Sequence, residues 1–149
     1  MVRKVIEIFS GISVILLCLF FISFLYVDTE KNILTFVEKM DCATVYQITK
    51  EQRTRLRQSY GIDYFMENAN SGSIYFCFVN HISETQFMAV YAPNMTAEDV
   101  FNEMTDPYQT EWNPQNGTDG EIIYTNSRGY IAIQNLKKNW YFVKEKQQN

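Results

Sequence analysis

The chain has 149 residues and a formal net charge of −4 at pH 7. This length allows one folded domain with a single core and a short additional segment, because domains typically need about 100–200 residues. The acidic balance argues against a nucleic-acid partner, since the phosphate backbone of DNA and RNA is bound by basic surfaces.

The N-terminal part of the chain contains an uncharged, apolar run at residues 8–27. At about 1.5 Å per residue, a helix of this length covers the roughly 30 Å hydrocarbon core of a bilayer, so we predict a transmembrane helix. A cleaved signal peptide would have a shorter apolar core, of roughly 7–15 residues, followed by a small-residue cleavage site. Arg3 and Lys4 precede the run, and cationic flanks stay in the cytoplasm. We therefore expect a single-pass signal-anchor in the cell membrane, with residues 1–7 cytoplasmic and the C-terminal domain periplasmic or extracellular.

Residues 28–41 are predicted to form an amphipathic stalk helix directly after the anchor. Its apolar residues recur at the three- and four-residue spacing of one helical face: they are Ile33, Phe36, Val37 and Met40. The extracytoplasmic domain is then expected to span residues 42–145, and residues 146–149 to form a polar tail.

The outer domain is expected to begin with a strand at residues 43–48, followed by a polar helix. Thr49 and Gln52 form a T-x-x-Q capping box, which marks the N-terminus of a helix. Gly61 marks its end, because glycine is the preferred residue just after a helix. This helix has few apolar residues to bury.

Residues 73–82 and 85–91 are rich in aromatic and β-branched side chains, and two polar residues separate them, so we predict a β-hairpin. Thr96 then caps a second helix of the outer domain. The apolar stripe of this helix consists of Ala97, Val100, Phe101 and Met104. We interpret its acidic residues, Glu103 among them, as a solvated face.

Residues 106–120 are long for a connection and full of turn-forming residues, which indicates a functional or mobile loop. Three strands joined by short polar turns are predicted to follow it, at residues 121–125, 129–134 and 139–145. Together, the elements predict an α+β fold with a mainly antiparallel sheet of five or six strands and two or three helices on one of its faces.

Cys42 and Cys77 are the only cysteines of the predicted outer domain. Because an extracytoplasmic compartment is oxidising, we predict that they form a disulfide. The bond would close a loop of about 35 residues and stabilise the fold by roughly 3–4 kcal/mol. The alternative is a pair of separate buried thiols.

Two sets of residues are candidates for binding. Tyr108 and Trp112 lie in the long loop, and exposed aromatic side chains are common in binding hot spots. Covering the core beneath the loop is an equally good interpretation of them. Arg53 and Arg57 are four residues apart on the polar helix and could bind anionic lipid headgroups or an acidic partner, although a solvated helix face also explains them.

No residue pattern in the sequence indicates catalysis, a metal or a cofactor. His81 and Cys77 would lie about 13 Å apart on one strand, which is too far for a catalytic dyad. The surroundings of His81 match no metal-binding spacing. We therefore expect a non-enzymatic, membrane-anchored module that binds a protein outside the cytoplasm, as an inhibitor, an immunity-type protector or a small subunit of an envelope complex. The alternative is a small-ligand sensor or a hydrolytic enzyme, which would need a pocket with several polar groups of shifted pKa.

Overall fold

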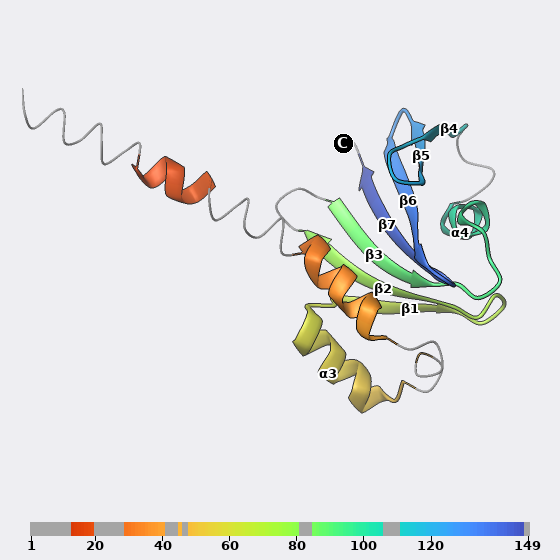
Figure 1. Ribbon diagram of the computed structural model, residues 1–149, viewed down its shortest axis with the longest axis horizontal. Helices are drawn as coiled ribbons and strands as arrows, with labels where there is room; N and C mark the ends of the chain where they lie inside the picture. Colours follow the sequence, from red (N-terminus) through yellow and green to blue (C-terminus); the bar gives the residue numbers. More distant parts are fainter. Residues whose placement is uncertain are drawn as a thin grey trace, which may run out of the picture.

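The computed structural model describes residues 13–19, 29–40, 45, 48–80, 85–105 and 111–147. Its main feature is a seven-stranded sheet in the order β1-β2-β3-β7-β6-β5-β4, in which every neighbouring pair is antiparallel (Figure 1). The strands are β1 (Tyr64–Asn68), β2 (Ser73–Asn80), β3 (Thr85–Tyr91), β4 (Asn113–Asn116), β5 (Glu121–Asn126), β6 (Gly129–Lys137) and β7 (Trp140–Gln147).

The predicted hairpin and the predicted C-terminal strands are confirmed. β2 and β3 pair in a register that places Phe78 opposite Phe87, and β5, β6 and β7 form a meander. β7 then pairs with β3 along its length and joins the two halves of the sheet. Aromatic and β-branched residues dominate these central strands, as expected for residues that pack on both faces of a pleated surface.

The predicted number of strands was too low, because both edge strands were missed. β1 is short, and β4 has the sequence Asn-Pro-Gln-Asn, which has almost no intrinsic preference for a strand. β4 exists because it pairs with β5, and a proline is tolerated at a sheet edge, where its missing N–H is not needed. The expected irregular loop at residues 106–120 therefore contains a strand. The expected polar tail was also wrong at Lys146 and Gln147, which belong to β7.

The described helices agree with their sequence signals. Residues 29–39 are helical, and α3 (Lys50–Tyr60) and α4 (Ala97–Met104) follow in the folded domain. The Thr49 capping box of α3 is confirmed, and α3 ends at Gly61 in the left-handed conformation. The expected N-cap of α4 is confirmed at Thr96, which forms a second capping box with Asp99.

The helices cover both faces of the sheet, whereas the sequence had indicated one. The 29–39 helix and α3 lie at the end of the sheet that contains β1, β2 and β3, and α4 lies beside β5 and β6 (Figure 1). One apolar cluster joins the first two helices to one face through Phe36, Phe76 and Trp140. A second cluster joins α4 to the opposite face through Phe101 and Tyr124. Since strand side chains alternate between faces, both faces of the central strands are apolar.

The predicted stalk helix packs on the domain along its apolar face. Ile33, Phe36 and Val37 are buried, and Met40 lies at the end of this face. Lys137 of β6 donates hydrogen bonds to the carbonyls of Val37 and Met40, which would otherwise be unpaired at the helix C-terminus. The helix therefore belongs to the domain and not only to the connection before it.

The expected strand at residues 43–48 is not supported where the structure describes it. Val45 is helical and buried in the cluster of the 29–39 helix, and Ile48 lies outside any strand. The other residues of this segment lie outside the described residues. A β-branched valine suits the sequence pattern of a strand, but Val45 is buried in a tertiary cluster, and tertiary packing can override a local preference.

Of the predicted transmembrane segment, residues 8–27, the structure describes residues 13–19 only, and these are helical. Within the described part of the chain, no helix has both the length and the apolarity needed to cross a bilayer.

Cys77 is a free, buried thiol on the face of the sheet that α4 covers. Its predicted disulfide partner, Cys42, lies outside the described residues, so the disulfide stays a prediction.

Candidate functional site

α4 leaves part of its sheet face uncovered, and a pocket of about 470 Å³ lies there. The helix packs over β5 and β6, and only its C-terminal end reaches toward β2. We call this hollow the sheet-face pocket. Its lining comes from β1, β2, β3, β7 and the end of α4, and consists of Tyr64, Met66, Glu67, Asn68, Tyr75, Gln86, Met88, Glu103, Met104, Glu145 and Gln147.

Glu103 is the most constrained polar group of the sheet-face pocket. Its Oε1 accepts hydrogen bonds from Ser71 at 2.7 Å and Ser73 at 2.8 Å, and its Oε2 accepts one from Tyr75 at 2.9 Å. Burial disfavours the charged form of Glu103, but the hydroxyl donors outweigh it and hold the pKa of this carboxyl below its usual value. Glu103 is therefore a carboxylate at neutral pH.

The pocket contains negative charge without a matching cation. No lysine or arginine is among the described residues that line it. Within the described residues, neither Glu103 nor Glu145 forms an ion pair, whereas Glu67 is paired with Arg53 on α3. The hydroxyl donors satisfy the hydrogen-bonding capacity of Glu103 but do not neutralise its charge, so a cation brought into the pocket would be attracted.

The Tyr75 hydroxyl and the Cys77 thiol are poor nucleophiles. Burial and the bond to Glu103 raise the pKa of Tyr75. Burial raises the pKa of the Cys77 thiol to about 11, against the opposing effect of hydrogen bonds with Tyr64 and Gln86; the charges of Asp63 and Glu145 raise it further by a smaller amount. A reactive cysteine needs a lowered pKa, so at neutral pH this thiol stays protonated. The arrangement suits recognition better than covalent catalysis.

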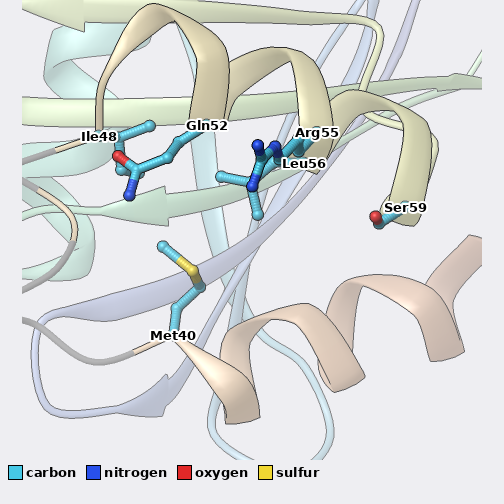
Figure 2. A pocket seen from close by; sticks show the side chains of 6 residues that line it. All are labelled: Met40, Ile48, Gln52, Arg55, Leu56 and Ser59. Atoms are coloured by element: carbon cyan, nitrogen blue, oxygen red, sulfur yellow. The ribbon is translucent and has the colours of Figure 1, made fainter.

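A second hollow, of about 230 Å³, lies between the end of the 29–39 helix and α3, and we call it the helix-pair groove. Figure 2 shows Met40 reaching from the helix end toward α3, opposite Gln52 and Leu56. Ile48, Arg55 and Ser59 complete the lining. The groove is mostly apolar and smaller than the range of about 300–1,000 Å³ that is typical of ligand pockets.

The two arginines that the sequence offered as binding candidates form contacts within the fold, and their role in binding stays a prediction. Arg53 pairs with Glu67 and lies over the ring of Phe65, 5.8 Å from its centroid. Arg57 donates hydrogen bonds to the carbonyls of Ile62 and Asp63. Both side chains therefore fix α3 against the start of β1.

Of the two loop aromatics, the structure describes Trp112 only, and Tyr108 lies outside the described residues. Trp112 is half-buried and packs edge-on against Phe101 of α4, with 5.5 Å between the ring centroids. This contact agrees with the interpretation that Trp112 covers the core.

The sequence interpretation missed the residues that form the sheet-face pocket. Glu103 was assigned to a solvated face, but it follows the buried Val100 by three residues and so lies on the same side of α4. This spacing was the one feature of the sequence that could have indicated that Glu103 faces the sheet. Ser71, Ser73 and Tyr75 join Glu103 through tertiary contacts that no local pattern indicates.

Comparison with known proteins leaves the function to be argued from this geometry. No protein-family model matches the chain, and no curated protein or solved structure is significantly similar to it.

Proposed function

We propose that the chain is a membrane-anchored module that binds another protein outside the cytoplasm, and that the sheet-face pocket is its contact surface. The observation that carries this proposal is an open hollow of about 470 Å³ in which Glu103 and Glu145 have no cation among the described residues. An inhibitor, an immunity-type protector and a small subunit of an envelope complex would all need such a surface.

The mixture of side chains in the pocket also suits a protein partner. Met66, Met88 and Met104 provide flexible apolar walls, and methionine adapts well to the shape of a bound side chain. Tyr64 adds an aromatic ring that is 38% exposed, and tyrosine is enriched at protein interfaces. Carboxylates beside such walls favour the aliphatic stem and charged head of lysine or arginine.

The anchor is proposed on the sequence of residues 8–27 and on one structural observation. Five apolar side chains of the 13–19 helix are between 53% and 61% exposed, so no described part of the domain covers them. A lipid environment would bury this surface. The cationic residues before the run then place the N-terminus in the cytoplasm and the domain outside it.

A small cationic ligand is the second candidate for the same pocket. Its volume lies within the range typical of ligand sites, and the pKa values of Tyr75 and Glu103, which line it, are shifted. Internal hydrogen bonds and burial account for these shifts without a ligand. We therefore favour the protein partner, and one capture experiment separates the two candidates.

The first experiment is affinity capture of the tagged full-length protein from its own membranes in mild detergent. We expect one partner in stoichiometric amount with the wild type. The Glu145→Lys variant should lose it, because the substitution places a positive charge in the pocket. Glu38→Lys makes the same charge change on an exposed position of the 29–39 helix, near its C-terminus where lysine is tolerated, and should retain the partner.

Equal capture by both variants would exclude the sheet-face pocket as the contact surface. A wild type that brings down no protein, but that carries a small cationic molecule in native mass spectrometry, would favour the ligand sensor.

A further inference from the structure

We infer that the partner docks as an extended segment that pairs with the free edge of β1 and places a lysine or arginine in the sheet-face pocket. This inference rests on the proposed function and specifies the chemistry of the partner. It joins three observations, of which the first and the last concern the described residues: a strand edge without a partner strand, exposed apolar side chains along that edge, and negative charge beside it without an ion-pair partner.

β1 is at one end of the sheet, and among the described residues it pairs with β2 alone. Such an edge presents backbone N–H and C=O groups that another strand can pair with. The opposite edge is β4, a four-residue strand interrupted by Pro114, which makes it a poor template. β1 has neither a proline nor a lysine to block an added strand.

Two side chains of β1 on the pocket face are large, mainly apolar and accessible. Tyr64 is 38% exposed and Met66 is 43% exposed. Proteins usually protect an edge strand with charges or cover it. In β1 the single charged residue, Glu67, is already paired with Arg53 of α3. An extended segment beside β1 would therefore bury apolar surface as well as pair its backbone.

The edge is open on both sides along part of its length. Glu67 and Asn68 line the sheet-face pocket and also a separate hollow of about 320 Å³ that includes Val45 and Ile74 of the opposite face. Hollows on both faces that meet at the same residues leave the strand edge between them accessible. Arg57 closes the edge just before the strand, since it occupies the carbonyls of Ile62 and Asp63.

Charge complementarity defines the partner. A strand added to β1 would lie about 4.8 Å from it, and its alternate side chains would stand on the pocket face beside Tyr64 and Met66. Glu103 and Glu145 line the same pocket and have no cation among the described residues. The segment that fits best is therefore extended, with lysine or arginine at alternate positions.

The test uses the full-length protein in nanodiscs of zwitterionic phosphatidylcholine and a fluorescent octapeptide that alternates lysine and valine. We expect the peptide to bind in an anisotropy titration and to slow amide hydrogen exchange in β1. Glu145→Lys should weaken binding about tenfold or more, and Glu38→Lys should leave it unchanged. The matching peptide that alternates glutamate and valine should not bind.

Backbone methylation separates strand pairing from simple charge attraction. Two versions of the lysine–valine peptide carry N-methyl groups, one on the lysines and the other on the valines. Alternate N–H groups of an added strand face β1, so one version should lose binding and the other should keep it. Equal binding of both versions, or unchanged exchange in β1, would overturn the inference.

The peptide experiment tests strand addition, and the capture experiment tests the proposed function, so the two can fail independently. If the lysine–valine peptide does not bind while partner capture still depends on Glu145, the protein-binding proposal stands and strand addition is wrong. If the peptide fails and capture is also insensitive to Glu145→Lys, both are wrong.

Discussion

At the residue scale, Glu103 is the clearest case in which one side chain connects stability and recognition. It ties the end of α4 to the start of β2 through Ser71, Ser73 and Tyr75. Hydrogen bonds to a charged acceptor are stronger than neutral ones, and each contributes roughly 1.5–3 kcal/mol. The same carboxylate supplies negative charge to the sheet-face pocket.

We predict that Glu103→Gln lowers the free energy of unfolding by about 1–3 kcal/mol at pH 7, because the amide keeps the shape but loses the charge. The matched variant Glu98→Gln, on the exposed face of the same helix, should change it by less than about 0.5 kcal/mol. Denaturant unfolding of the full-length protein in detergent measures both.

The difference in stability between the wild type and Glu103→Gln should depend on pH. The pKa of Glu103 is lowered in the folded state from its usual value of 4.5. Its stabilising contribution is therefore present above pH 4.5 and is lost as the pH falls through the lowered pKa. The stability difference between wild type and Glu103→Gln should shrink below pH 4.5. A difference that stays constant from pH 7 to pH 3 would mean that the charge is not responsible.

At the scale of elements, capping residues and aromatic-rich runs correctly predicted the helices and strands whose formation depends on neighbouring residues in the sequence. The T-x-x-Q sequence fixed the start of α3, the Thr96 cap fixed the start of α4, and aromatic-rich runs identified the central strands. β1 was missed because it is short, and β4 was missed because its pairing with β5, and not its own residues, makes it a strand. The glycine at the start of β6 is likewise required by a neighbouring strand and not by its own sequence surroundings.

Gly129 has φ of +150°, and a Cβ added there would lie 2.0 Å from the backbone carbonyl oxygen of Lys146 in β7. We predict that Gly129→Ala destabilises the protein by roughly 2–4 kcal/mol, because backbone must move to admit the methyl group. Gly61→Ala, at the left-handed end of α3 with open space around it, should cost only about 1 kcal/mol. Thermal unfolding of the two variants gives the comparison, and equal losses would show that the close approach of β7 is unimportant.

At the scale of the whole molecule, the sheet has two differently covered faces. The 29–39 helix and α3 cover one face at its β1 end, and α4 covers part of the other. The uncovered remainder is the sheet-face pocket, so the position of α4 creates the candidate site. If the chain is anchored by residues 8–27, this face is presented outside the cytoplasm.

We predict that the protein stays in the membrane fraction after an alkaline carbonate wash, because an apolar helix is held by the bilayer and not by charge. In intact cells or right-side-out vesicles, a tag at the C-terminus should be removed by added protease. A tag at the N-terminus should be protected. Release by carbonate, or the opposite protection pattern, would contradict the anchor or its orientation.

The sequence by itself determined the α+β class, the capped helices, the central antiparallel strands and the acidic character of the chain. These follow from periodicity, capping residues and composition, which act over a few residues. Only the tertiary structure decided that helices cover both faces, that β1 and β4 complete the sheet, and that Arg53 and Arg57 fix α3 to β1. It also brought Ser71, Ser73, Tyr75 and Glu103 together, although up to 32 residues separate them along the chain. Contacts of that kind depend on strand order and helix placement, and no local pattern encodes either.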